Sequence, residues 1–349
     1  MIKPFKFLTN RVLRLYTGGS RIDRLRGERE EDNNYPEDWI ASCIEGNGRT
    51  YHSPGHGISQ ITYDGVIHSF PEFLQEHPLE ILGPAHVSRF GANPGVLTKL
   101  LDSAELLPLQ VHPSRMDAER LFGLPYGKTE AWIILATREI NGEEPYLFVG
   151  FNEEFDRTIF FQESLEGKYR KGFKMLHKLT VEPGDVIVIH GGLPHAVGPG
   201  ITMVEVMEPS DLVIVPEINC CGLMLDEAKR FSGLSPQTAL ELFDTTAWSE
   251  SELRATIMPQ SQTVAENQCG TLKTILPYCA CNHYFTVQEL TLHGEWELLP
   301  CKTFRIGVLI EGSFRLGDLI LHTGDSFMVP YEMKTCSLVG TGKIIWILP

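Results

Sequence analysis

Short apolar segments separated by turn-forming residues are the feature that most restricts the fold of this chain. Its 349 residues include 32 glycines and 22 prolines, which separate one apolar run from the next. Frequent breaks of this kind favour many short strands over a few long helices. With 42% hydrophobic residues, the chain is long enough for two domains, each with its own core. We therefore expect a mainly β fold with a few short helices.

A recurring turn predicts that the same kind of barrel is built twice. The runs PGDVIVI and TGDSFMVP each place a Gly-Asp pair, at Gly184 and at Gly324, just before an apolar strand. Glycine adopts turn geometries that other residues resist, and such turns recur in jelly rolls. We expect a larger N-terminal domain with helical insertions in residues 1–244, a polar linker in residues 245–267 and a second barrel in residues 268–349.

Three local patterns guide the prediction of individual elements. Residues 1–35 are basic and then acidic, which indicates an ordered lead-in followed by a mobile loop, or simply a solvated arm. The runs VLTKLLD and LLPLQVH, within Val96–His112, are predicted to form neighbouring strands. Ser114, with Asp117 three residues later and apolar positions beyond, predicts a helix of two or three turns.

Charge and composition exclude several classes of function. A net charge of -15 disfavours nucleic acid and anionic membrane as partners, because the long-range field repels polyanions. No stretch approaches the roughly 20 apolar residues that span a bilayer, and the N-terminus lacks the apolar core of a signal peptide. The eight cysteines contain no zinc-finger pattern and are expected to be reduced. We expect a cytoplasmic protein whose partner is a small molecule.

Four separated polar residues are candidates for a metal site. Gln110 and His112 are two residues apart and leave the same face of a strand, Glu130 begins the next predicted strand, and His195 follows a Gly-Gly turn. Two imidazoles, a carboxylate and an amide oxygen suit Zn²⁺, and Mn²⁺, Fe²⁺ or Co²⁺ would also fit. A single histidine on a strand is more often a packed core residue, but four candidates in one pattern favour one divalent metal.

Three segments resemble a known enzyme family. LLPLQVHPS, YGKTEAWIIL and PGDVIVIHGGLPHAVGPGITMVEVMEPSD are similar to type I mannose-6-phosphate isomerases of the cupin superfamily, especially the short bacterial form. The resemblance is specific from about Trp39 to Asp211 and weaker beyond. It implies two cupin jelly-roll barrels and a zinc enzyme that interconverts mannose 6-phosphate and fructose 6-phosphate. By motif position, the metal ligands of the family fall on Gln110, His112, Glu130 and His195.

The resemblance also assigns catalytic positions, and one of them departs from the family. The active-site lysine falls on Lys128 and an acidic residue on Asp211, but the family's arginine falls on Val215. Thr335 stands where a second barrel would need a histidine, so we expect that barrel to be metal-free. Lys128 precedes Glu130 by two residues and would stabilise a cis-enediolate or contact a phosphate, unless it is an exposed lysine at the rim.

Three further residues are candidate substrate contacts. The sequence also leaves two alternative functions open. Lys99, Arg115 and His190 are the candidates, although helix solvation or packing between strands would explain them equally well. The missing arginine and the acidic charge favour a second hypothesis, an isomerase or epimerase of another sugar, with or without a phosphate. A third is a non-catalytic sugar-binding cupin. The oligomeric state is left open.

Overall fold

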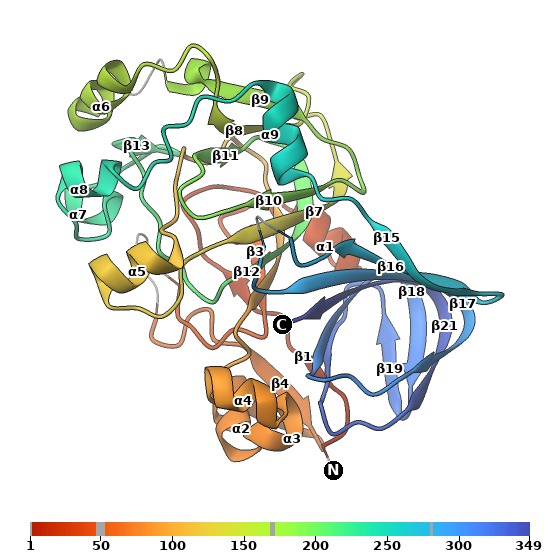
Figure 1. Ribbon diagram of the computed structural model, residues 1–349. Helices are drawn as coiled ribbons and strands as arrows, with labels where there is room; N and C mark the ends of the chain where they lie inside the picture. Colours follow the sequence, from red (N-terminus) through yellow and green to blue (C-terminus); the bar gives the residue numbers. More distant parts are fainter. Residues whose placement is uncertain (1, 47–52, 168–171, 280–281) are drawn as a thin grey trace.

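The computed structural model of the protein describes residues 2–46, 53–167, 172–279 and 282–349 (Figure 1). Strands predominate, so the predicted mainly β fold is confirmed. No helix in these ranges is both long and apolar enough to cross a membrane.

Two sheets dominate the N-terminal half. A six-stranded sheet has the order β10-β7-β12-β6-β3-β2, and a three-stranded sheet has the order β11-β8-β9. Their strands are β2 (Arg11–Val12), β3 (Glu37–Ile40), β6 (Leu97–Asp102), β7 (Glu130–Thr137), β8 (Tyr146–Phe151), β9 (Leu176–Thr180), β10 (Val186–Ile189), β11 (His195–Val197) and β12 (Ile201–Met207). A two-stranded sheet, β13 (Asn219–Cys220) with β14 (Leu223–Met224), lies apart from them. Strands β6 and β12 are buried at every position, although they carry Lys99, Asp102 and Glu205, and β7 is buried over its first five residues.

A ten-stranded sheet contains the C-terminal strands and also reaches back to the N-terminus. Its order is β15-β16-β17-β21-β18-β20-β1-β4-β5, with β19 paired to β18. Its strands are β1 (Phe5–Phe7), β4 (Gln60–Tyr63), β5 (Val66–Ser69), β15 (Gln262–Asn267), β16 (Gly270–Leu276), β17 (Thr286–Leu298), β18 (Arg305–Leu316), β19 (Leu319–His322), β20 (Ser326–Val329) and β21 (Cys336–Leu348). Because Phe5 pairs with Met328, segments from both sides of the predicted division share this sheet. The division into two domains stays a prediction.

Short helices cover the ends of the sheets, and α2, α3 and α4 form one group below the N-terminal strands in Figure 1. The helices are α1 (Ser20–Arg26), α2 (Phe70–Glu76), α3 (Pro78–Leu82), α4 (Pro84–Phe90), α5 (Arg115–Phe122), α6 (Arg157–Glu166), α7 (Glu227–Arg230), α8 (Pro236–Leu240) and α9 (Glu250–Ile257), with a 3-10 turn at Gly172–Met175. Helix α5 confirms the prediction from Ser114, whose side chain accepts a hydrogen bond from the Asp117 backbone N–H at 3.2 Å.

Two predicted elements differ in the structure. LLPLQVH is not a regular strand, because only Gln110 and Val111 form isolated bridges, to His195 and Ile214. Pro108 has no N–H to donate, which limits pairing at that point. Residues 245–267, expected to be a linker, contain helix α9 and strand β15 instead.

Candidate metal site and its pocket

His112, Glu130 and His195 form a compact buried group. The ligand-type atoms of all three lie within 4.8 Å of one another. Glu130 Oε2 is 3.5 Å from His112 Nε2, and Glu130 Oε1 is 3.5 Å from His195 Nε2. The three side chains are at most 1% exposed. A carboxylate between two imidazoles at this spacing is a donor set that suits a divalent transition metal.

The backbone brings these residues together from distant parts of the chain. The N–H of Gln110 donates to the His195 carbonyl at 2.9 Å, and the His195 N–H donates back to the Gln110 carbonyl at 3.0 Å. Gly191 allows this approach, since a Cβ there would lie 2.6 Å from the Ser114 backbone. Gly192 follows with φ +93°, a conformation that favours glycine. The Gly-Gly turn therefore fixes the position of His195 against the segment that carries His112.

Hydrogen bonds orient both imidazoles in the same way. His112 Nδ1 lies 2.9 Å from the Leu212 carbonyl oxygen, and His195 Nδ1 lies 2.8 Å from the Leu193 carbonyl oxygen. A carbonyl only accepts, so Nδ1 carries the proton in each ring and Nε2 presents a lone pair to the group. Burial and the neighbouring His112 lower the pKa of His195 to about 3, and burial together with Lys128 lowers the pKa of His112. Both rings are therefore neutral, as metal ligation requires.

The group leaves polar atoms that a cation would satisfy. His195 Nε2 and Glu130 Oε2 are buried and have no hydrogen-bond partner of good geometry, although Lys128 Nζ lies 3.1 Å from Glu130 Oε2. Burial raises the pKa of Glu130, but Lys128 and His112 outweigh it and hold the carboxyl well below its usual range. Buried unpaired acceptors cost stability unless something binds them. The residues present therefore fit a divalent metal ion.

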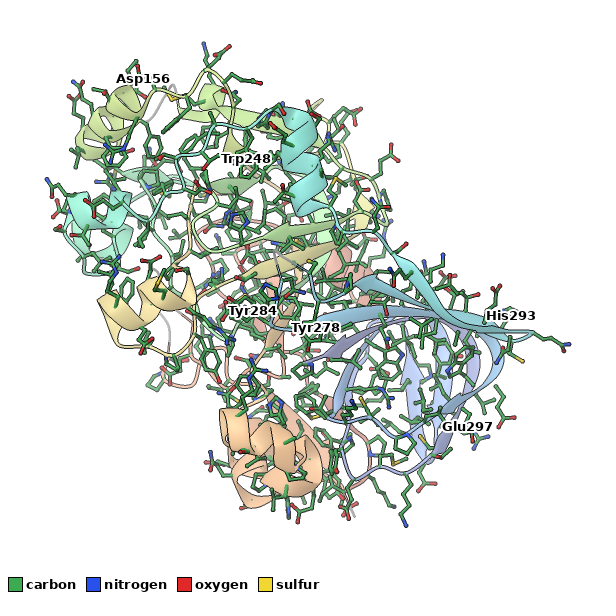
Figure 2. The ribbon with its side chains drawn as sticks, viewed as in Figure 1. Asp156, Trp248, Tyr278, Tyr284, His293 and Glu297 are labelled. Atoms are coloured by element: carbon green, nitrogen blue, oxygen red, sulfur yellow. The ribbon has the colours of Figure 1, made fainter. Side chains whose placement is uncertain are left out.

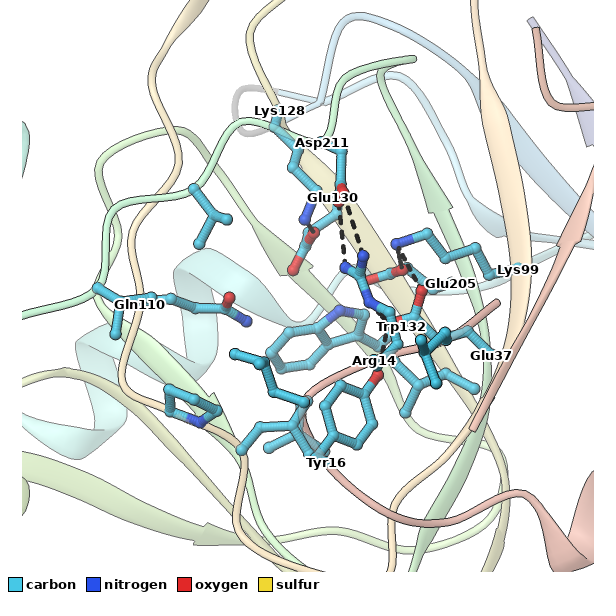
Figure 3. Close-up of a pocket in the computed structure, with 18 residues that line it drawn as sticks. Arg14, Tyr16, Glu37, Lys99, Gln110, Lys128, Glu130, Trp132, Glu205 and Asp211 are labelled. Carbon is cyan, nitrogen blue, oxygen red and sulfur yellow. Dashed lines mark hydrogen bonds and ion pairs between the residues drawn. The ribbon is translucent and has the colours of Figure 1, made fainter. Parts of the chain in front are cut away.

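A polar pocket opens beside this group (Figure 3). Its lining includes Gln110, whose amide extends into the pocket from the side opposite Glu130 in Figure 3. The charged residues that line it are Arg14, Glu37, Lys99, Lys128, Glu205 and Asp211 together with Glu130. The two histidines lie behind this lining, so the ligand-type atom nearest the open space belongs to Glu130 or Gln110.

Opposite charges alternate around the pocket. Lys99 Nζ is 2.8 Å from Glu205 Oε2 and 3.4 Å from Glu37 Oε2, and Arg14 Nε donates to Glu37 at 2.9 Å. Burial raises the pKa of Glu37 on its own, but Arg14 and Lys99 outweigh that effect and bring it to about 2. Burial raises the pKa of Glu205, which Lys99 only partly opposes. Within one pocket, the pKa of Glu37 is thus lowered and the pKa of Glu205 is raised.

The residues suggested from sequence reach the site to different degrees. Lys99, Lys128 and Asp211 line the pocket. Arg115 instead forms an ion pair with Glu208, and its guanidinium lies 4.2 Å from the centre of the Tyr284 ring, a residue labelled near the middle of the molecule in Figure 2.

His190 also has a partner elsewhere, since its Nε2 is 3.9 Å from Asp244 Oδ2. Among the residues that the structure assigns to the pocket lining, neither His190 nor Arg115 occurs.

Sequence reasoning missed four polar residues that line this pocket: Arg14, Tyr16, Glu37 and Glu205. Glu205 had a usable signal, because it is a charge in the middle of the apolar run ITMVEVM. Arg14 and Tyr16 had none, since they lie in a stretch whose charge pattern indicates a lead-in or an arm.

Comparisons with known proteins find similarity to the same family that the motifs resemble. Residues 274–349 match the family model described as mannose-6-phosphate isomerase, cupin domain. The chain is 26% identical to mannose-6-phosphate isomerase ManA of Bacillus subtilis, over 78% of this chain and 79% of that protein. It is 28% identical to the mannose-6-phosphate isomerase of Streptococcus mutans, over 99% of this chain and 98% of that protein. The model match falls in the C-terminal part, where the motifs indicate the weaker resemblance.

The fold agrees as well. The crystal structure of the mannose 6-phosphate isomerase from Bacillus subtilis superimposes with a TM-score of 0.76 at 21% identity, over 99% of this chain and 100% of that one. At this identity the match shows a shared fold. The resemblance to this family, and the mainly β cupin-type fold that it implies, are confirmed.

Proposed function

We propose that this chain, which resembles the mannose-6-phosphate isomerase family in sequence and fold, is a metal-dependent isomerase that interconverts mannose 6-phosphate and fructose 6-phosphate. The observation that carries the proposal is the buried His112, Glu130 and His195 group beside a charged pocket, with His195 Nε2 lacking a hydrogen-bond partner. The amide of Gln110 would complete the ligand set. We propose zinc as the ion, because imidazole, carboxylate and amide donors suit it.

Isomerisation moves a proton between C1 and C2 through a cis-enediol, so the developing charge on two oxygens must be stabilised. A bound divalent ion supplies this by polarising the sugar oxygens. Lys128 would share the task, since its Nζ lies 3.1 Å from Glu130 Oε2 and Lys128 lines the same pocket. A fixed, buried ammonium stabilises an enediolate more strongly than an ammonium in water.

We propose different roles for two carboxyl groups of the pocket, with Glu205 transferring a proton and Asp211 staying ionised. Glu205 is the candidate for proton transfer, because it lines the pocket and burial raises its pKa above the ordinary value of a glutamate. Burial also raises the pKa of Asp211, but Arg14 and Lys99 hold it far below its usual range. Asp211 therefore stays ionised, and we propose that it orients its neighbours and a sugar hydroxyl without exchanging protons.

A coupled assay for fructose 6-phosphate tests the proposal directly. Protein stripped of metal and reloaded with Zn²⁺ is expected to form fructose 6-phosphate from mannose 6-phosphate, and the stripped protein is not. Elemental analysis of the same samples verifies one ion per chain. Fully loaded protein without turnover would remove the proposed activity.

One observation favours the second candidate, an isomerase or epimerase of an unphosphorylated sugar. Each cation that lines the described pocket already faces a carboxylate: Arg14 faces Asp211, Lys99 faces Glu205 and Lys128 faces Glu130. A phosphate dianion would have to compete with these partners. Ligand-induced thermal shifts of the metal-loaded protein, with mannose and mannose 6-phosphate in parallel, separate the two substrates and also reveal a sugar-binding protein without turnover.

A further inference from the structure

Arg14 enters the pocket from the first residues of the chain. It follows strand β2, and its backbone N–H donates to the Asn34 carbonyl at 2.9 Å. Its terminal nitrogens donate to the two oxygens of Asp211, each at 3.1 Å, across a sequence separation of 197 residues. With Nε on Glu37, the guanidinium is held on two sides, as Figure 3 shows. A fork held in this way has one orientation.

Val215 lines the same pocket as Arg14. Its side chain is buried with Val213, Cys220 and Leu225, and Leu15 packs against this cluster. Val215 therefore belongs to an apolar cluster against which Leu15, the residue next to Arg14, packs.

The Arg14 guanidinium keeps its charge, and its bonds to Glu37 and Asp211 use three of its five N–H donors. Burial alone lowers the pKa of Arg14, but Asp211 and Glu37 outweigh it and raise the pKa above its usual value. The bonds to Glu37 and Asp211 use one N–H on each of the three nitrogens. A second N–H on each terminal nitrogen remains for a ligand.

We propose that Arg14 contacts the oxygens of the bound sugar phosphate and supplies the positive charge that an arginine at position 215 would otherwise bring to this pocket. This inference rests on the proposed function, because it assigns a substrate contact to the proposed isomerase site. Asp211, Glu37 and Leu15 are then positioning residues that hold Arg14 in place.

Steady-state kinetics of Arg14→Met, Arg14→Lys and the double variant Arg14→Met/Val215→Arg test the proposal. Arg14→Met is expected to lower kcat/KM about 10- to 100-fold, mainly through KM, as the loss of a charged hydrogen bond does. Arg14→Lys is expected to recover only part of this, because an ammonium lacks the planar fork. The double variant is expected to recover about tenfold over Arg14→Met. Arg24→Met, whose ion pair with Glu30 is exposed, is the matched control and should match the wild type.

The outcomes separate a substrate contact from a structural ion pair. An unchanged KM in Arg14→Met, at wild-type metal content, overturns the proposal. A double variant that is as stable as Arg14→Met but no more active also overturns it; stability is measured because Val215 is buried. Should Arg14→Met fail to fold, the KM of Arg14→Lys decides in the same way.

Calorimetric binding of mannose 6-phosphate distinguishes this failure from failure of the proposed function. If the wild type binds without turnover, and Arg14→Met binds more weakly, the isomerase activity is lost while the Arg14 contact stands. Equal binding by both proteins overturns the Arg14 contact, and no binding by the wild type overturns both proposals.

Discussion

The N-terminal six-stranded sheet and the C-terminal strands β18, β20 and β21 use the same turn but bury different side chains. Gly184, before β10, has φ 100°, and Gly324, before β20, has φ 89°. Beyond the turn, the N-terminal sheet carries the Lys99 and Glu205 ion pair, whereas the C-terminal strands carry an apolar cluster that includes Phe327 and Trp346. The comparison teaches that the turn fixes the backbone, while the residues on the sheet face decide whether it supports chemistry.

Strand register shows how each interior is filled. In the N-terminal sheet Glu205 pairs directly with Lys99 on β6, so opposite charges face each other across neighbouring strands. In the C-terminal sheet Gly307 pairs with both Phe327 and Trp346, and a Cβ there would lie 2.4 Å from the Phe327 ring. The glycine leaves room for the rings of Phe327 and Trp346, whose centroids are 5.2 Å apart and which fill this part of the interior with apolar side chains.

The largest expected effect comes from removing one of the proposed metal ligands of the N-terminal region. His112→Ala or His195→Ala is expected to abolish stoichiometric metal and to lower turnover by at least about a thousandfold. Each change removes an imidazole ligand together with the backbone hydrogen bond that orients it. Elemental analysis of the purified variants measures this. His293→Ala is the control, since Figure 2 shows His293 at the outer edge of the C-terminal sheet. Full metal retention in both histidine variants would mean that these histidines do not hold the metal, and the proposed difference in metal binding between the two regions would not stand.

A smaller effect is expected when the lysine of the site is replaced. Lys128→Met should keep the metal but lower kcat by about 10²- to 10⁴-fold, the usual range for a group that handles charge or protons. Lys343→Met in the C-terminal sheet, where Lys343 Nζ is 3.4 Å from Glu289, should leave kcat unchanged. Initial rates at saturating substrate, with metal content measured in parallel, provide the test. Equal kcat values for the two variants would contradict a catalytic role for Lys128.

The two interiors should also differ in how they respond to core substitutions. Lys99→Met leaves Glu205 buried without its cation, while Glu37 keeps Arg14, and is expected to cost about 3–5 kcal/mol of unfolding free energy. The double variant Lys99→Met/Glu205→Gln should regain part of that loss, because one buried charge is removed with its partner.

Leu309→Ala in the C-terminal cluster is the counterpart, with an expected cost of about 2–5 kcal/mol from a cavity. Urea unfolding of the variants, followed by fluorescence, gives both costs. A double variant less stable than Lys99→Met would show that Glu205 is not stabilised by Lys99.

Local signals allowed part of the fold to be predicted. Ser114 gave helix α5, and the Gly-Asp pairs gave the turns before β10 and β20, because these features depend on neighbours in sequence. The same kind of signal was missed at Ser249, which forms a capping box with Glu252 at the start of α9. The polar composition around it indicated a linker, although Leu253 and Ile257 are buried.

The pocket could be predicted only where a short spacing or a motif marks it. His112, Glu130 and His195 stand in recognisable motifs, and the structure brings them together. Arg14 meets Asp211 only through the fold, so neither residue alone indicates the other. Long-range pairs of this kind depend on which strands become neighbours, which local propensity does not determine.

The smallest expected effect is on the acid stability of the N-terminal region. The folded protein holds the pKa of Glu37 at about 2, below its ordinary 4.5, so the ionised carboxylate stabilises the fold at neutral pH. This contribution is complete above the ordinary pKa and is lost as the pH falls from about 4.5 toward 2. Glu37→Gln removes the titration, so its melting temperature should fall less steeply across this window than that of the wild type, by a few degrees over the window. Glu297→Gln, on the C-terminal sheet, should follow the wild-type slope. Parallel melting curves for Glu37→Gln and the wild type would mean that Arg14 and Lys99 do not hold this carboxylate ionised. The charged N-terminal interior and the apolar C-terminal interior would then not differ in how their stability depends on acid pH.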